Sequence, residues 1–258
     1  MNDQLNAQQC REIIAELAML LPQAMAKHFP RLPRLDFEIE GEDEEEVVRT
    51  RWDPVFTGGG IVSMLITDPE APQAMFTKDV DLVLEIASHP DFYAMEKALE
   101  SVGFRRPRDE HTEILSWEWR GVRVDALPHR RIQSLDTNRW FVFLMKDAEH
   151  VEVLPGRRAW IASAPCFIAT KLQAFASRGN NNFLKSKDIG DILAVVNGRD
   201  KLLQEIHRAA PEVREFLRQR FGWLLEQPHF MESLSLIVPE NQREEIVIDR
   251  MRQIGSPT

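Results

Sequence analysis

Residues 54–86 read PVFTGGGIVSMLITDPEAPQAMFTKDVDLVLEI, and this stretch decides the fold that the sequence predicts. Two apolar residues lead into Gly58-Gly59-Gly60, and a short apolar run with Ser63 inside it follows. This pattern predicts a turn that opens a helix. A glycine turn at a helix start exposes backbone N–H groups and partial positive charge, so it favours an anion such as a phosphate.

The end of the stretch has the alternation of a β-strand. Apolar side chains at 80, 82, 84 and 86 alternate with Asp79, Asp81 and two further residues. The two aspartates therefore share one face of the strand, about 7 Å apart at roughly 3.4 Å per residue. Like charges at this spacing repel unless a cation lies between them. A hard divalent ion, Mg²⁺ or Mn²⁺, suits carboxylate oxygens together with the phosphate oxygens of a substrate.

A glycine turn, a short helix and an Asp-hydrophobic-Asp strand together resemble the DNA polymerase β-type nucleotidyltransferase superfamily. The resemblance implies an α/β (α+β) fold, with a mixed sheet flanked by helices and a helical C-terminal domain. Nineteen residues, 60–78, separate Gly59 from Asp79. This is more than the superfamily's usual spacing, and we expect the surplus to loop out at residues 68–72.

A predicted hairpin over residues 113–127 turns at Gly121 and carries a lone acid, Asp125, in its apolar second strand. The superfamily places its third metal-binding carboxylate on a strand beside the Asp-x-Asp strand. The resemblance therefore implies that Asp125 is that third ligand. The alternative is a strand acid that is satisfied by Arg123 or by solvent.

Two helices with a polar face each are predicted after Ser163. Lys171 and Arg178 share a face of the first helix, and Asp188 and Asp191 share a face of the second. This Lys-x6-Arg then Lys-Asp-x-x-Asp arrangement is similar to the AbiEii/MenT-like toxin branch of the superfamily. The alternative is that these four side chains only pair with one another between two helices. Both interpretations can hold.

The resemblance assigns a role to each candidate residue. In that branch the helix lysine contacts nucleotide phosphates and the later aspartate helps to order the site. The hydroxyl that assists the glycine turn is Ser63 or, alternatively, Thr57. The implied catalytic residues are Asp79, Asp81, Asp125 and Lys171, the metal ligands are Asp79, Asp81 and Asp125, and the nucleotide-binding residues are Gly58, Gly59, Gly60, Ser63, Lys171, Arg178 and Asp188.

The rest of the sequence predicts helices and a strand that contribute to the core and not to the site. We expect a first helix over residues 3–27, an edge strand at 35–39 before the acidic run 42–46, and helices from 201 to 254 divided by three prolines. The predicted domains are a catalytic domain at 1–155, including the first helix, and a helical domain at 156–258.

Composition limits the class of protein. The chain has 258 residues, of which 43% are hydrophobic and 28% charged, as is ordinary for a globular protein. Its two cysteines indicate a reducing compartment. It has neither an apolar leader nor an apolar run of about 18 residues, so we expect a cytoplasmic protein without a membrane partner. A net charge of −9 argues against sequence-independent binding of long nucleic acid.

The expected activity is transfer of an NMP from an NTP to an acceptor hydroxyl, with Mg²⁺ or Mn²⁺ as cofactor. The resemblance implies tRNA as the acceptor and a cognate antitoxin as a protein partner, as in toxin-antitoxin systems. One alternative is an adenylyltransferase that acts on a small molecule such as an antibiotic, or on a protein. Another is a catalytically silent module that binds a nucleotide or a partner. The intact set of three carboxylates favours an enzyme.

Overall fold

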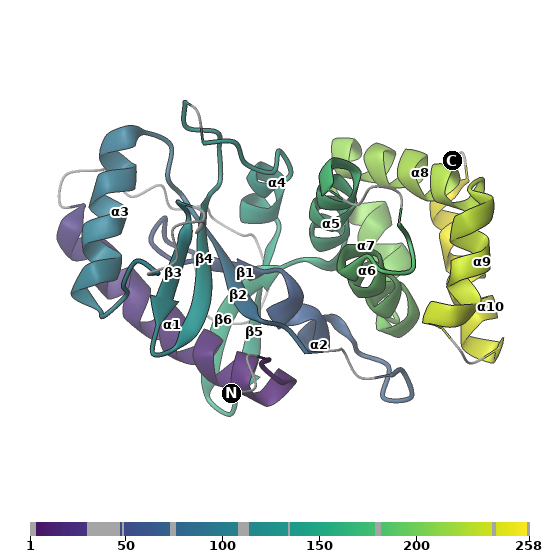
Figure 1. The fold of residues 1–258 in the computed structure, drawn as a ribbon, viewed down its shortest axis with the longest axis horizontal. Coiled ribbons are helices and arrows are strands. Elements are labelled where there is room, and N and C mark those ends of the chain that lie inside the picture. The colour runs from purple at the N-terminus through teal and green to yellow at the C-terminus, as the bar shows by residue number, and fades with distance from the viewer. Residues whose placement is uncertain are drawn as a thin grey trace.

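Figure 1 shows the computed structural model, in which a sheet with flanking helices lies beside a second group of helices. The predicted edge strand at 35–39 and the acidic run at 42–46 lie outside the described residues. No helix of the described chain is long and apolar enough to cross a bilayer. The structure describes residues 4–29, 47, 49–72, 76–107, 114–133, 135–178, 182–238 and 241–256.

The described residues form a mixed six-stranded sheet in the order β3-β4-β2-β1-β6-β5. β2 pairs in parallel with β4, and β1 with β6, whereas the other neighbours are antiparallel. The mixed α/β class predicted from the sequence is confirmed. The strands are β1 Val55–Thr57, β2 Asp79–Leu84, β3 Ser116–Trp119, β4 Val122–Pro128, β5 Ala148–Leu154 and β6 Arg157–Ala162.

Alternation along β2 and β4 explains how the sheet has one dry face and one polar face. Val80 and Leu82 are fully buried, while Asp79 and Asp81, which alternate with them along β2, are partly exposed. The predicted hairpin is present as β3 and β4, and Gly121 in its turn has a φ of 79°. The hairpin of β5 and β6, which the sequence analysis did not assign, completes the other side of the sheet.

Helix α1 (Ala7–His28) begins at a capping box of Asn6 and Gln9 and continues through Pro22 without a break. It packs against β5, β6 and α3 (His89–Ser101). α3 ends just before Gly103, whose φ of 92° suits a helix terminus. A short helix, α4 (Phe141–Lys146), contacts the next long helix in the chain, α5 (Ala164–Arg178).

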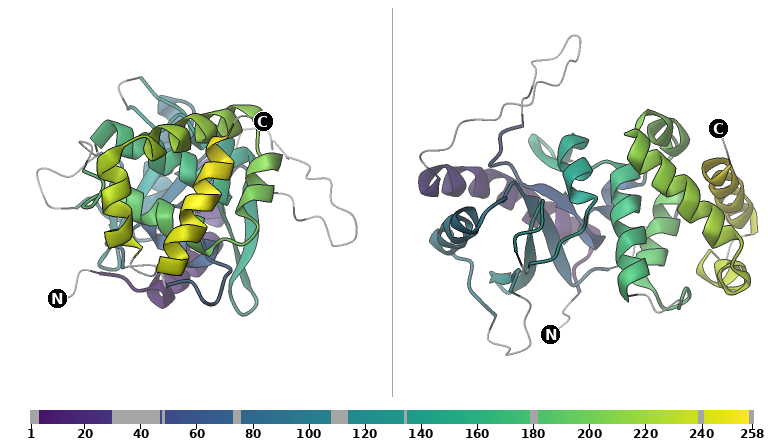
Figure 2. Two further views of the ribbon diagram at one scale, coloured as in Figure 1. Left: turned by 90° about the vertical axis from the view of Figure 1, so that its right-hand side faces the viewer. Right: turned by 90° about the horizontal axis from the view of Figure 1, so that it is seen from above.

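The chain after the sheet is helical, as predicted, and its helices lie together at one end of the molecule (Figures 1 and 2). Pro211 and Pro228 each stand in the first turn of a helix, where a missing N–H group does little harm. Division into two domains stays a prediction, and the sheet itself extends to Ala162. The helices are α5 Ala164–Arg178, α6 Lys187–Gly198, α7 Leu202–Arg208, α8 Pro211–Leu225, α9 Pro228–Ile237 and α10 Asn241–Gly255.

The segment between the glycine turn and β2 begins with the expected short helix, and a loop held by contacts with α6 follows it. After a 3₁₀ turn (Gly59–Ile61), α2 spans only Val62–Leu65. The backbone N–H groups of Thr67 and Asp68 then donate to the carbonyl oxygen of Gly198, at 2.8 and 2.9 Å. The start of the loop is therefore docked on the C-terminal end of α6.

This docking predicts opposite effects for two alanine substitutions in α6. A Cβ on Gly198 would lie 2.8 Å from Cγ2 of Ile66 and 3.1 Å from Cβ of Ala71, whereas a Cβ on Gly190 would meet nothing within 4 Å. We expect Gly190→Ala to raise the free energy of unfolding by about 0.5–1 kcal/mol through helix propensity. Gly198→Ala should lower it by about 1–3 kcal/mol through overpacking. Urea denaturation measures both, and a Gly198→Ala variant as stable as Gly190→Ala would contradict the docking.

Candidate active site

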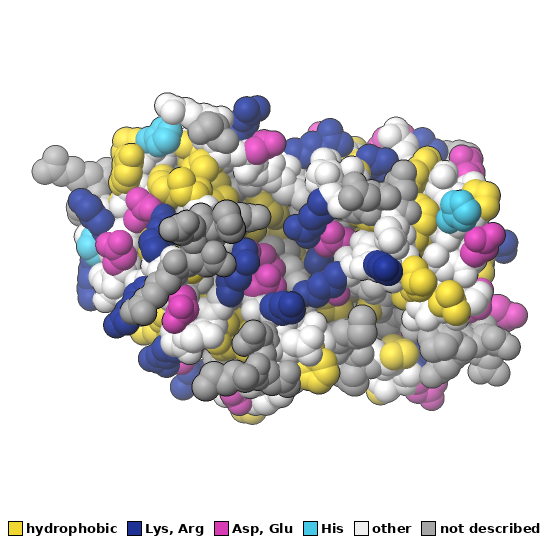
Figure 3. Space-filling view, viewed as in Figure 1, with side chains coloured by type: hydrophobic (Ala, Val, Ile, Leu, Met, Phe, Trp, Pro, Cys, Tyr) yellow, Lys and Arg dark blue, Asp and Glu magenta, His cyan; other side chains and the backbone are white. Residues whose placement is uncertain are grey.

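The parallel pairing of β2 and β4 brings the three predicted aspartates to one place. Asp81 lies directly opposite Asp125 in the register, and Asp79 precedes Asp81 by two residues on the same face. All three line one cavity of about 520 Å³. Figure 3 shows the molecule in the same view as Figure 1. Basic side chains (dark blue) and acidic side chains (magenta) lie side by side in the middle of the face that it shows.

Asp81 has the most strongly perturbed environment of the three. Burial raises the pKa of Asp81 to about 7, and the negative charges of Asp79 and Asp125 add to this effect. Lys171 and Lys187 act in the opposite direction. The fold thus concentrates negative charge at a half-buried position. Such a position is typical of a functional site.

The carboxylates suit a divalent cation in their chemistry, and the register of β2 and β4 sets Asp81 beside Asp125. Oxygen donors suit Mg²⁺ or Mn²⁺, and a cation would neutralise the charge gathered around Asp81. The side chains have other partners, however: Asp79 accepts a hydrogen bond from Thr77 at 3.0 Å, and Asp125 accepts from Ser116 at 2.6 Å. Within the described chain, no group of three His, Cys, Asp or Glu side chains is gathered closely enough to hold a metal ion. To bind a metal ion, Asp79 would give up its hydrogen bond with Thr77, and Asp125 its hydrogen bond with Ser116.

Arg123 also contacts Asp125. Its Nε lies 3.1 Å from Oδ1 of the aspartate, within the same strand. The pairing that the sequence analysis weighed as an alternative is therefore present. Arg123 also lines the large cavity, so the same ion pair places a cation beside the three carboxylates.

The three glycines have different surroundings. Gly58 has a φ of 69°, and a Cβ there would lie 1.7 Å from Oδ2 of Asp81, so only glycine fits. Gly59 lines the large cavity, where a Cβ would come within 2.7 Å of Nζ of Lys187. Gly60 is buried and lines no part of that cavity. Within the turn, Gly59 lines the cavity and Gly58 lies against the carboxylate of Asp81.

Of the two candidate hydroxyls, Thr57 is the better placed. Ser63 lies in α2, and neither of the two cavities at the carboxylates includes it in its lining. Thr57 is the partner of Asp81 in the register of β1 and β2, and it lines the second of these cavities. Because α2 has a single turn, little helix dipole can act on an anion here, and the glycine turn's N–H groups remain as donors.

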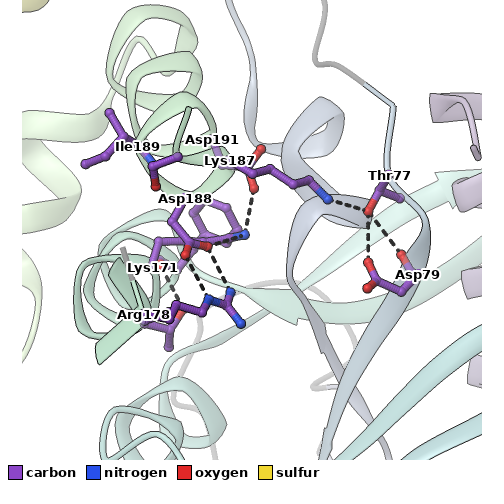
Figure 4. Close-up of polar contacts among 12 residues, drawn as sticks. Thr77, Asp79, Lys171, Arg178, Lys187, Asp188, Ile189 and Asp191 are labelled. Atoms are coloured by element: carbon purple, nitrogen blue, oxygen red, sulfur yellow. Dashed lines mark hydrogen bonds and ion pairs between the residues drawn. The ribbon is translucent and has the colours of Figure 1, made fainter. Parts of the chain in front are cut away.

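Lys171 is buried between α5 and α6, and it makes both ion pairs that the sequence analysis weighed. Its Nζ lies 3.2 Å from Asp188 and 2.6 Å from Asp191 (Figure 4). Arg178 contacts the same Asp188 at 3.2 Å. Burial by itself lowers the pKa of Lys171, but Asp191 and Asp188 outweigh it and raise that pKa. The lysine therefore stays charged while lining the cavity.

Lys187 is a site residue that the sequence analysis missed. Ser186 caps α6 through a hydrogen bond from Ile189, and this start directs Lys187 across to the sheet. Its Nζ donates to Oγ1 of Thr77 at 2.8 Å, and Thr77 in turn donates to Asp79 (Figure 4). Lys187 is the first residue of the Lys-Asp-x-x-Asp motif, directly before Asp188, and this position could have marked it as a candidate. Only the two acids of the motif were given a role.

Comparisons with known proteins find structural likeness alone. An antigenic nucleotidyltransferase-like protein from Paracoccidioides brasiliensis superposes with a TM-score of 0.49 at 15% identity, over 92% of this chain and 100% of its own. JHP933 from Helicobacter pylori superposes with a TM-score of 0.38 at 11% identity, over 93% of this chain and 91% of its own. The sequence matches no protein-family model and no curated protein. Neither likeness is close enough to carry a function to this chain.

The buried ion pairs predict a large effect of Lys171 on stability. Lys171→Met leaves Asp188 and Asp191 with one cation fewer, so we expect it to lower the free energy of unfolding by about 3 kcal/mol. Lys185→Ala is the matched control, because Lys185 lines the same cavity but is exposed, and its effect should stay below about 0.5 kcal/mol. Thermal and urea unfolding measure both variants. Equal stabilities would show that the ion pairs do not hold α5 against α6.

Proposed function

We propose that this chain is a metal-dependent nucleotidyltransferase that transfers an NMP from an NTP to an acceptor hydroxyl. One observation carries the proposal: three carboxylates on adjacent strands share a cavity with a glycine turn and a set of cations. The carboxylates suit a divalent cation, and the cations with the turn suit phosphates. A cavity of about 520 Å³ is in the range of nucleotide-sized sites.

The cationic wall supplies phosphate ligands of different kinds. Lys185 is exposed at the cavity, and Lys187 lies beside Gly59. Lysine binds phosphate as a compact point charge, and a glycine turn binds it through backbone N–H groups. Lys171 and Arg178 are held in place by Asp188. This side of the cavity would therefore take the triphosphate.

The reaction itself is an in-line displacement. The acceptor oxygen forms a bond to the α-phosphorus, the bond from that phosphorus to the bridging oxygen breaks, and pyrophosphate leaves with the electron pair while the hydroxyl proton passes to water. A bound Mg²⁺ or Mn²⁺, held by Asp79, Asp81 and Asp125, would offset phosphate charge and make the hydroxyl more acidic. Lys187 and the N–H group of Gly59 would offset charge on the departing pyrophosphate.

Lys171 combines a structural and a catalytic role in this proposal. Its ion pairs to Asp188 and Asp191 set the spacing of α5 and α6, and its position on the cavity wall brings positive charge toward Asp81. Asp188 orders the wall by contacting both Lys171 and Arg178. The predicted tRNA acceptor, antitoxin partner and cytoplasmic location stay predictions, as does the small-molecule acceptor.

A transfer assay tests the proposal. The protein is incubated with Mg²⁺, with each NTP labelled at the α-phosphate, and with total tRNA, a panel of polyols or the protein itself as acceptor. We expect label transfer and pyrophosphate release that EDTA abolishes. Asp81→Asn should lower the rate at least about 100-fold, because it removes a cation ligand. Glu118→Gln, an exposed acid on β3 of the same sheet, is the control and should leave the rate unchanged.

Absence of pyrophosphate release with every NTP would contradict the proposal. Full activity of Asp81→Asn would also contradict it, because the carboxylates would then have no part in the reaction. The catalytically silent alternative predicts that nucleotide binds without any release. The assay therefore separates an enzyme from a binding module.

A further inference from the structure

A second cavity, of about 400 Å³, adjoins the first at the carboxylates. The two cavities share lining residues, so a group bound in one would meet a group bound in the other at Asp81 and Asp125. Five residues line both cavities: Asp81, Asp125, Lys171, Arg178 and Asp188.

The two cavities differ in the charge of the residues that they do not share. The first has Arg123, Lys185, Lys187 and Asp79. Among the described residues that line the second, the one further charged side chain is Asp136, which is exposed. The additional cations of the first cavity attract a polyphosphate. The second cavity has no cation beyond the shared Lys171 and Arg178 among its described lining residues. The second cavity therefore suits a group without phosphate.

The uncharged lining of the second cavity offers both hydrogen bonds and apolar contact. Thr57 lines this cavity, but its hydroxyl oxygen is buried and out of reach of solvent. The side chain of Gln173, which ends in an amide, is half-buried and lines the same cavity. Asn138, by contrast, donates to the carbonyl of Thr170 at 2.9 Å and so holds the wall. The apolar part of the lining consists of Leu115, Leu127, Phe141 and Ala174.

We propose that the second cavity is the acceptor site and that it takes a sugar-like ring, rich in hydroxyl groups and free of phosphate. The proposal rests on the proposed function, because it needs an NTP in the first cavity. A ring offers hydroxyls to the amide of Gln173 and C–H groups to the apolar wall. One of its hydroxyls would then stand at Asp81 and Asp125, where the α-phosphate arrives from the other side. An amine on the ring would find a counter-ion in Asp136.

The first arm of the test asks which cavity holds the nucleotide. The dissociation constant of a non-hydrolysable NTP analogue with Mg²⁺ is measured by calorimetry for two variants. Lys185→Ala, in the first cavity, should weaken binding about tenfold through loss of a charged contact. Gln173→Leu, in the second, should change it by no more than about twofold. If Gln173→Leu weakens binding as much as Lys185→Ala, the second cavity holds the nucleoside and the proposal is overturned.

The second arm asks what the second cavity binds. Saturation-transfer NMR is recorded with the protein, Mg²⁺ and the same analogue, using glucosamine, glucosamine 6-phosphate and tRNA as probes. We expect a signal for glucosamine, loss of that signal in Gln173→Leu, and a much weaker signal for the phosphorylated sugar. Equal signals from the two sugars, or binding of tRNA without binding of glucosamine, would overturn the proposal.

The two arms also separate this inference from the proposed function. If the analogue does not bind, or binds equally with Mg²⁺ and with EDTA, the proposed function itself fails. If the analogue binds with Mg²⁺ and the probes do not follow the expected order, only the acceptor site fails.

Discussion

The site depends on the close approach of Gly58 to Asp81. A Cβ at Gly58 would lie 1.7 Å from the carboxylate, so only glycine lets β1 and β2 pair with this acid on the polar face. The contact brings the glycine turn and the carboxylates together. Asp81 is half-buried; burial is the main cause that raises its pKa to about 7, and the charges of Asp79 and Asp125 add to it. Negative charge gathered at such a position destabilises a fold unless it is neutralised, and the proposed cation would neutralise it.

Helix α6 supplies the opposite wall because both of its ends contact the same part of the chain. At its N-terminus Lys187 bonds Thr77, and at its C-terminus Gly198 accepts from Thr67 and Asp68. The buried Arg243 of α10 contacts Asp68 as well. Asp68, one of the residues expected to loop out, therefore helps to hold α6 against the segment that leads into β2. Together with the contact of Lys187 with Thr77, it fixes where Lys187 and Asp188 stand relative to β2.

Sequence reasoning found what depends on local periodicity and missed what depends on packing between distant elements. The side-chain period of two placed Asp79 and Asp81 on one face, and the same period singled out Asp125. The register that sets Asp81 opposite Asp125 is a property of the sheet, and only the resemblance anticipated it. Lys187 reaches the sheet from a helix more than a hundred residues away in the chain. The short helix after the glycine turn is present as α2, but the docking of the next residues on Gly198 was not anticipated. The second cavity combines residues of several elements, and no single motif marks it.

The most direct test of the account is the position of a bound metal ion and a nucleotide in crystals. Crystals grown with Mn²⁺ and a non-hydrolysable NTP analogue would locate the metal by its anomalous scattering. The account predicts a Mn²⁺ peak at the carboxylates of Asp81 and its two neighbours, with phosphate density near Gly59 and Lys187. A nucleotide bound elsewhere, or Mn²⁺ absent from Asp81 when the nucleotide is bound, would contradict it.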